Sequence, residues 1–467
     1  MTIPAAPDAI TTPQPGARHP LDHIPGSDGW PIVGNTLKVL RDPVGSANEA
    51  YQKYGPVYRS RVFGYRSVSL LGPEANELLL FDRDKNFSSH GGWGPVLDRV
   101  FPRGLMLMDF DDHRMHRKAL GVAFKPAPMK TYLGALNDGI SSRIAEWHLA
   151  GDGQGAGVDM KFYPAIKQLT LDLAATSFLG IVLGPEANAV NRAFVDMVAA
   201  SIGVVRSPIP GTQMWRGVKG REVIVDFFGK EIPKRRAGTA TDLFSELCRA
   251  TKEDGQLLSD QEIIDHMSFL MMAAHDTLTS SVTSLVYQLA ANPVWQGRLR
   301  DEMRALKLAP GAALPYERLG ELSLLEMAFK EAMRINPPVP SIPRRAVRDF
   351  TFKGFHIPAG TRVGVNTLFT HRMPDIWPEP EKFDPLRFTD EAVRGRHKYA
   401  WVPYGGGAHM CLGLHFAYMQ AKCFFYHLLT TTEVRIADGY VPRWQMWPIP
   451  KPRDGLPIRL ERIGAGA

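Results

Sequence analysis

The glycine-rich segment at residues 404–413 constrains this chain more than any other part of the sequence. It reads Tyr-Gly-Gly-Gly-Ala-His-Met-Cys-Leu-Gly, and an apolar, helix-compatible run follows it from Leu414 to Leu429. The other cysteines, Cys423 and distant Cys248, do not have the short spacing of a zinc site. Glycine lets backbone N–H groups approach a sulfur closely, and the N-terminal end of the following helix favours thiolate over thiol. The pattern therefore predicts that Cys411 is a buried thiolate with a positive partner, and haem iron is such a partner.

The same segment resembles the haem-binding loop of the cytochrome P450 monooxygenases. In this resemblance Cys411 is the iron ligand, and Gly407 and Gly413 belong to the loop that binds the cofactor. His409 stands where the family has arginine or histidine, whereas Tyr404 stands where phenylalanine is usual. The alternative is a glycine-rich turn around an inert buried cysteine, and the length of the pattern disfavours it.

The order of the motifs along the chain indicates one large unit. By length alone, 467 residues suggest about three domains, but segments that resemble this one family follow each other from near residue 30 to near residue 460. We therefore expect a single haem domain over residues 25–467, mainly α with a small β region. Residues 1–24 are expected to form a disordered tail.

Composition indicates the cellular compartment of the protein and the kinds of partner that it binds. Three cysteines suit a reducing compartment, no secretory signal is visible, and no run approaches the ~20 apolar residues of a membrane span. The sequence thus predicts a cytoplasmic protein without a transmembrane segment. The net charge of +7 comes without basic runs interleaved with aromatic residues, which disfavours nucleic acid. A basic patch that docks an acidic electron carrier is more consistent with a haem enzyme.

A long helix is predicted over residues 259–292. Ser259 and Glu262 fit a capping box at its start, and Pro293 ends it. Its apolar middle contains Asp276 next to Thr277, and a buried carboxylate is costly unless it has partners or a task. Splitting dioxygen consumes two protons, so the resemblance implies that Thr277 is the distal alcohol and Asp276 the proton-relay acid. The chain has alanine at residue 274, where the family commonly has glycine.

A second helix, expected over residues 323–335 with a Ser323–Glu326 capping box, places Glu331 and Arg334 on one face. Taken alone, such a pair is a surface salt bridge of little value. The family locks it to an arginine in a later Pro-x-Arg-Phe segment, and Arg387 occupies that place here. The resemblance implies a structural triad of Glu331, Arg334 and Arg387.

Haem propionates need cations and hydrogen-bond donors, and several bases stand at family positions. His113 and Arg117 lie four residues apart on one predicted helix face. Arg344 resembles the family's strand arginine, with Arg345 as a rival, and His409 is a further candidate. The alternative for each residue alone is a surface base.

A long connection is expected at residues 86–108, and four apolar segments are candidates for the substrate pocket: residues 88–108, 269–273, 339–342 and 446–448. Each is equally compatible with ordinary core. The candidate residues are Trp93, Leu97, Phe101, Met106, Phe269, Met272, Ala273, Val339, Ile342 and Trp447.

The resemblance implies a haem b (iron protoporphyrin IX) monooxygenase that inserts oxygen from O2 into a lipophilic substrate. The segment 208–219 resembles the sterol-, retinoid- and plant-steroid-oxidising branch, so a sterol, terpenoid or retinoid-like lipid is expected. Fatty acids come next, but they need a cation near the pocket mouth, and none stands out in these segments. Electrons are expected from a separate ferredoxin and its reductase. The alternatives are a peroxide-dependent haem-thiolate enzyme, which typically lacks the acid–alcohol pair, and a non-enzymatic haem-binding or sensor protein.

Overall fold

The computed structural model describes residues 3–4, 7, 9–13, 16, 19–150, 157–181, 184–203, 205–309 and 311–463. Helices dominate this part of the chain. They are α1 (Thr36–Arg41), α2 (Pro43–Tyr54), α3 (Pro73–Phe81), α4 (Ser89–Leu97), α5 (Phe110–Leu120), α6 (Pro126–Leu149), α7 (Phe162–Ser177), α8 (Pro185–Ser201), α9 (Gln213–Ala237), α10 (Leu243–Arg249), α11 (Asp260–Ala291), α12 (Pro293–Ala305), α13 (Ser323–Ile335), α14 (Thr367–Thr370), α15 (Asp390–Arg394) and α16 (Leu414–Thr431), with short 3-10 turns η1 (Leu105–Leu107), η2 (Gly121–Phe124), η3 (Tyr316–Glu321), η4 (Pro385–Phe388) and η5 (Gly407–His409).

The strands form one larger sheet and three small ones. The six-stranded sheet has the order β1-β2-β3-β9-β6-β4, in which β1–β2 and β3–β9 are parallel and the other pairs antiparallel. The smaller sheets are β10-β13-β5, β11-β12 and β7-β8. The strands are β1 (Gly26–Ser27), β2 (Val57–Val62), β3 (Tyr65–Leu70), β4 (Phe87–Ser88), β5 (Val158–Lys161), β6 (Ile342–Ala346), β7 (Phe350–Phe352), β8 (Phe355–Ile357), β9 (Arg362–Val365), β10 (Thr432–Arg435), β11 (Trp444–Gln445), β12 (Lys451–Pro452) and β13 (Pro457–Arg462).

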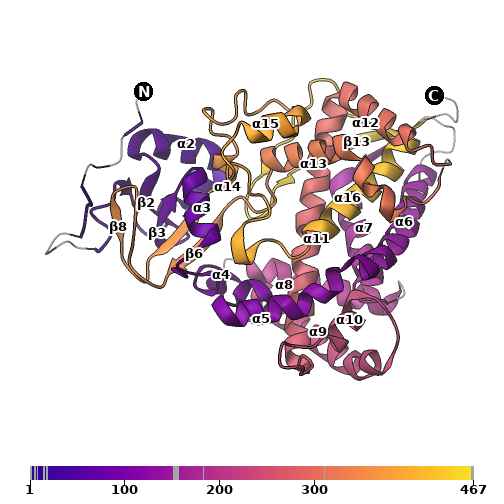
Figure 1. Cartoon of the computed structure of the whole chain (residues 1–467), viewed down its shortest axis with the longest axis horizontal. Coiled ribbons are helices and arrows are strands. Elements are labelled where there is room, and N and C mark those ends of the chain that lie inside the picture. Colours follow the sequence, from indigo (N-terminus) through magenta and orange to yellow (C-terminus); the bar gives the residue numbers. More distant parts are fainter. Residues whose placement is uncertain are drawn as a thin grey trace.

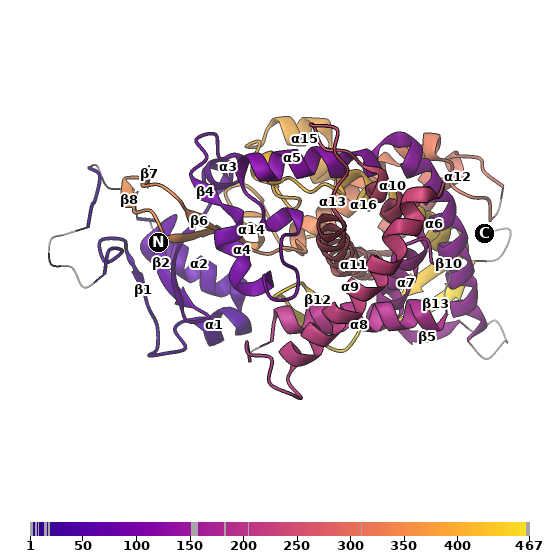
Figure 2. The same cartoon turned by 90° about the horizontal axis from the view of Figure 1, so that it is seen from below.

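The larger sheet lies on one side of the molecule, and most of the helices lie on the other (Figure 1). The sheet lies toward the N-terminal side together with α2 and α3, whereas α6, α7, α12 and α16 lie toward the C-terminal side. Helix α11 runs through the helical part and packs against α7, α9, α13 and α16, which Figure 2 shows around it. This arrangement matches the prediction of a mainly α fold with a small β region.

Helix α11 confirms the expected long helix. The Ser259 side chain accepts a hydrogen bond from the Glu262 N–H, and the Glu262 carboxylate accepts one from the Ser259 N–H, so the capping box is present. Most of its side chains are buried, because neighbouring helices cover it on several sides. A helix with this environment can hold polar groups in the interior at fixed positions. None of the helices in the described ranges is long and apolar enough to cross a membrane.

The start of α13 differs from the prediction of a Ser323–Glu326 capping box. Leu322 occupies the N-cap and makes no side-chain capping bond. Instead, the Glu302 carboxylate on α12 accepts hydrogen bonds from the N–H groups of Leu324 and Leu325, at 2.6 and 3.0 Å. The Ser323–Glu326 box is therefore wrong, because a neighbouring helix supplies the acceptor.

The segment 86–108, expected to be a long connection, contains helix α4. The Ser88 hydroxyl caps this helix by accepting a hydrogen bond from the Gly91 N–H at 2.8 Å. A Cβ on Gly92 would lie 2.5 Å from the Pro343 carbonyl oxygen. The glycines here allow α4 to pack closely on β6.

The expected tail at residues 1–24 lies partly outside the described residues, as do residues 464–467 of the expected domain. In the described part, the Thr11 N–H donates to the Gly354 carbonyl at 2.8 Å, next to β8. Leu21 and Ile24 are buried in the core formed by the larger sheet. The boundary at residue 24 stays a prediction.

Candidate active site

The cysteine loop is held in a closed turn in front of α16. The Cys411 N–H donates to the Tyr404 carbonyl at 2.9 Å, and the Met410 N–H donates to the Gly407 carbonyl at 3.1 Å. Helix α16 begins three residues after Cys411, so its positive N-terminal end lies near the sulfur. Burial raises the pKa of the Cys411 thiol, while the Gly413 N–H and the Arg117 guanidinium lower it. A cationic partner at the sulfur is what this site needs to hold a thiolate.

The glycines of the loop have different structural roles. Gly407 has a φ of +60°, and a Cβ there would lie 2.2 Å from the Leu80 carbonyl oxygen on α3. The loop therefore packs against α3 in a way that excludes a side chain at residue 407. At Gly413 the nearest atom to a Cβ would be a Phe124 ring carbon at 4.0 Å. The protein itself thus leaves room for a side chain at residue 413.

The four bases expected to bind propionates gather near the cysteine loop. The rings of His113 on α5 and His409 stack with centroids 3.9 Å apart. Arg344 on β6 and Arg117 on α5 act electrostatically on both histidines. Arg345, the rival candidate, is exposed and donates to a backbone carbonyl at 3.0 Å. The structure thus places Arg344, and not Arg345, toward the interior.

This cluster carries two guanidinium charges, and the nearby Asp82 and Asp109 act on Arg344 only from beyond ion-pair distance. In the described part of the chain, neither Arg117 nor Arg344 forms an ion pair with a carboxylate. Burial, followed by the charge of Arg344, lowers the pKa of His409 to about 2. Burial, followed by the charge of Arg117, lowers the pKa of His113 to about 4. One buried and one half-buried guanidinium, together with two histidines that resist protonation, fit a bound dianion. The residues present therefore fit a haem with its two propionates.

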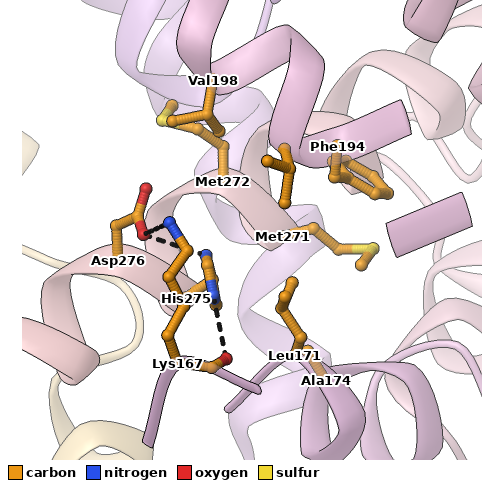
Figure 3. A pocket seen from close by; sticks show the side chains of 10 residues that line it. Lys167, Leu171, Ala174, Phe194, Val198, Met271, Met272, His275 and Asp276 are labelled. Atoms are coloured by element: carbon orange, nitrogen blue, oxygen red, sulfur yellow. Dashed lines mark hydrogen bonds and ion pairs between the residues drawn. The ribbon is translucent and has the colours of Figure 1, made fainter. Parts of the chain in front are cut away.

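Asp276 and Thr277 on α11 do not contact each other through their polar groups. The Thr277 hydroxyl donates to the Ala273 carbonyl one turn earlier, at 2.6 Å. The Asp276 Oδ1 lies 3.1 Å from the Lys167 Nζ and 3.2 Å from the His275 Nδ1 (Figure 3). The structure therefore brings the acid and the alcohol to adjacent positions but turns the acid toward α7.

Lys167 is a partner of the acid that sequence analysis missed. It lies on α7, where Asp172 is the only other charged residue, and an isolated lysine in an apolar helix was the available signal. Its backbone carbonyl also lies 3.3 Å from the His275 Nε2. A cavity of about 10 Å³, enough for about one water molecule, adjoins these groups (Figure 3). The Lys167 side chain is partly exposed, so it links Asp276 to the surface.

The predicted triad is assembled in the core. The Glu331 carboxylate accepts two hydrogen bonds from Arg334, at 2.7 and 2.8 Å, and both side chains are fully buried. The Arg387 Nε lies 3.4 Å from the Glu331 Oε1. Arg334 also donates to the His371 carbonyl at 3.0 Å, which ties α13 to the segment that leads into the cysteine loop.

A large open cavity of about 800 Å³ lies between the larger sheet, α4 and the segment 446–448. Of the pocket candidates, Trp93, Val339 and Trp447 line it, together with Arg344. Met272 lines the small cavity beside Asp276. The others are packed in or against the hydrophobic cores: Leu97, Phe101, Met106, Phe269, Ala273 and Ile342.

Several cations that sequence analysis did not single out also line the large cavity. Lys38, Lys53 and Arg59 belong to the N-terminal part of the chain, whereas two others come from distant segments, Arg206 after α8 and Arg362 on β9. The sequence segments considered for the pocket offered no clear cation at its mouth. The fold supplies both because it brings two distant segments to one cavity.

Comparisons with known proteins agree with this geometry. The family model described as Cytochrome P450 matches residues 24–448. The chain is 36% identical over 456 residues to a putative cytochrome P450 136 of Mycobacterium tuberculosis, covering 97% of this chain and 90% of that protein. It is 28% identical over 453 residues to a beta-amyrin 28-monooxygenase of Vitis vinifera, covering 93% of this chain and 91% of that protein.

A solved structure shows the same fold. The structure of retinoic acid-bound cyanobacterial CYP120A1 superposes with a TM-score of 0.84 at 29% sequence identity, covering 94% of this chain and 99% of that one. This match confirms the predicted mainly α fold of the haem-thiolate monooxygenases.

Proposed function

Because this chain belongs to the cytochrome P450 family and is a haem-dependent monooxygenase, we propose that it oxidises a sterol, terpenoid or retinoid-like lipid. The reaction inserts one oxygen atom of O2 into a C–H bond, and the second atom leaves as water. The family assigns the monooxygenase reaction, its lipophilic substrate and its need for redox partners. The class of lipid is our proposal.

The observation that carries the proposed substrate class is the cavity of about 800 Å³. Small-molecule sites span about 300–1,000 Å³, so this volume suits a bulky molecule. Trp93, Val339 and Trp447 supply apolar lining, and the Phe63 and Trp447 rings pack 4.6 Å apart beside it. Burial of apolar surface contributes roughly 25 cal/mol per Å², so a large isoprenoid binds well with few polar contacts.

Two relatives support the same class. One is named for the oxidation of beta-amyrin, and the solved structure was determined with retinoic acid bound. Both names describe large, mostly apolar molecules. A fatty acid remains the second candidate, since a cationic side chain lines the cavity.

Cys411 is the proposed protein ligand of haem b, and four bases are the proposed propionate partners: His113, Arg117, Arg344 and His409. The bound haem would supply the activation of dioxygen. The protein's tasks are to hold the thiolate, to neutralise the propionates and to bind the substrate in the cavity. The excess of cations at this site supports the assignment.

Asp276 and Thr277 are the proposed groups for proton delivery. In the structure, Lys167 holds the Asp276 carboxylate on the side of α7. We infer that Asp276 takes up a proton on this side, near the partly exposed Lys167, and passes it toward Thr277 after a rotamer change. The Thr277 hydroxyl keeps its own proton directed to the Ala273 carbonyl until then.

Electrons are proposed to come from a ferredoxin and its reductase. A peroxide-dependent enzyme would not need the acid–alcohol pair, and the presence of Asp276 and Thr277 disfavours it. The family match over residues 24–448 leaves little of this chain for a sensor's output domain.

A titration panel tests the substrate class. Sterols, triterpenoids, retinoids, fatty acids and small polar compounds are added to the purified haem protein, and shifts of the haem Soret band are recorded. We expect saturable shifts with the isoprenoids and none with the polar compounds. Binding of a small hydrophilic compound alone, without response to any isoprenoid or fatty acid, would contradict the proposal.

A further inference from the structure

Arg206 and Arg362 both line the large cavity, and neither forms an ion pair with a carboxylate in the described part of the chain. Arg362 lies on β9, and its guanidinium stacks on the Tyr65 ring with the Cζ 3.9 Å from the ring centroid. Arg206 follows α8 and lies within range of an electrostatic interaction with Tyr65. Tyr65 therefore lies near both cations, and all three residues line the cavity.

The two guanidiniums differ in their hydrogen bonds. Arg206 donates to four backbone carbonyls, two of them at Pro95 and Val96 on α4, at 3.0 and 2.8 Å. Its donors are thus used to fasten the α8–α9 connection to α4. Arg362 stacks on Tyr65, and within the described ranges its guanidinium forms neither a hydrogen bond nor an ion pair with another residue.

Of the other cations that line the cavity, Lys38 pairs with Glu49 and Arg59 pairs with Asp28. Lys53 is exposed, and Arg344 is assigned to the propionates. Arg362 is therefore the cation whose donors remain for a ligand.

The surroundings of Arg362 are unfavourable for an unpaired charge. Its cross-strand partner on β6 is Arg345, and like charges directly opposite each other destabilise a sheet. Burial lowers the pKa of Arg362, and the charge of Arg345 adds to the effect, yet guanidinium stays protonated near neutrality. A monoanion in the cavity would offset this repulsion.

We infer that this cavity selects lipophilic substrates that carry a carboxylate, and that Arg362 binds that carboxylate. The planar guanidinium matches a carboxylate with two parallel hydrogen bonds. Tyr65 fixes the plane of the guanidinium by stacking, and Arg206 adds positive potential without direct contact. The apolar body of the substrate then lies along Trp93 and Trp447. This inference rests on the proposed function and adds the charge of the substrate to it.

Matched acid–ester pairs test the inference. Retinoic acid, abietic acid and palmitic acid are each titrated against the methyl ester of the same acid, with the haem Soret shift as the binding signal. We expect the acids to bind the wild-type protein roughly tenfold more tightly than their esters, as one charge-assisted pair provides. Arg362→Gln should remove this preference by weakening the acids and not the esters, and Arg362→Lys should restore part of it.

Arg345→Gln is the matched control, because Arg345 pairs with Arg362 across the sheet but is exposed and does not line the cavity. It should leave most of the acid preference in place, because the carboxylate is bound by Arg362 and Arg345 contributes only its charge. Equal affinity of acids and esters for the wild-type protein overturns the inference, as does a preference that survives Arg362→Gln. Binding of the esters in either case would leave the proposed function standing. Failure of all six lipids to bind would overturn the inference, and failure of the sterols and triterpenoids as well would overturn the proposed function.

Discussion

His409 and His113 are held neutral in the folded protein, and we therefore predict that acid destabilises the haem-free protein. Their pKa values of about 2 and 4 lie below the ordinary value of 6.5, so the unfolded chain binds more protons once the pH falls below that value. The haem-free protein should lose stability as the pH falls from about 7 to about 5, a range that spans the ordinary histidine pKa. Urea unfolding at both pH values measures the loss.

His409→Gln is the control for that prediction, since it removes the group with the largest shift. Its haem-free form should lose less stability on acidification than the wild type. Haem should also reduce the loss, because propionates facing the cluster favour the protonated histidines. Equal pH dependence in the wild type and His409→Gln would show that the cluster does not govern acid stability.

Proton delivery by Asp276 and Thr277 is tested by measuring two quantities separately. One is the rate of product formation, and the other is the coupling, which is the fraction of reducing equivalents that ends in product. Asp276→Asn should slow product formation by about 10²–10⁴, the usual worth of a positioned proton donor, with little change in substrate affinity. Thr277→Ala should keep its haem but divert reducing equivalents into hydrogen peroxide. Product, peroxide and consumed NAD(P)H are measured together. Full coupling and normal turnover in both variants would leave Asp276 as a purely structural partner of Lys167.

At the scale of elements, the packing of the cysteine loop on α3 depends on one glycine. Gly407→Ala places a Cβ 2.2 Å from the Leu80 carbonyl oxygen at a φ of +60°. We expect a loss of about 1–3 kcal/mol or more in unfolding free energy, together with reduced haem content. Gly413→Ala is the matched control, because the nearest atom lies at 4.0 Å, and it should cost less. Similar effects of both substitutions would show that the close contact with α3 is not what requires glycine.

The helices also show which kind of sequence signal is sufficient to predict where an element begins and ends. The capping box and the terminal proline of α11 are local, and the helix was predictable with its bounds. The cap of α13 comes from Glu302 on another helix, and α4 forms where glycines pack against β6, so local patterns misjudged both. The same difference between local and long-range signals applies to the active site. Motif residues such as Cys411 were accessible from the sequence, but Lys167 and Arg362 acquire their roles only when distant segments meet.

At the scale of the whole molecule, the net charge of +7 predicts how the electron donor docks. Part of the expected basic face is already compensated, because Arg114 and Lys118 lie 3.3 and 3.1 Å from Glu253. Reduction by an acidic ferredoxin should still slow as salt rises, since the Debye length falls from ~10 Å at 0.1 M to ~3 Å at 1 M. Glu253→Gln should accelerate reduction at low salt by removing the opposing charge. Stopped-flow rates that do not depend on salt or on Glu253 would mean that docking is not driven by charge.

Identifying the protein ligand of the haem iron tests the whole account most directly. The reduced carbon monoxide complex is recorded for the wild type, for Cys411→His and for Cys423→Ala, in which a buried core cysteine is replaced. We predict the red-shifted Soret band of thiolate ligation in the wild type and in Cys423→Ala. Cys411→His should bind haem without that band. Persistence of the red-shifted band in Cys411→His would contradict the assignment of Cys411 and, with it, the active site described above.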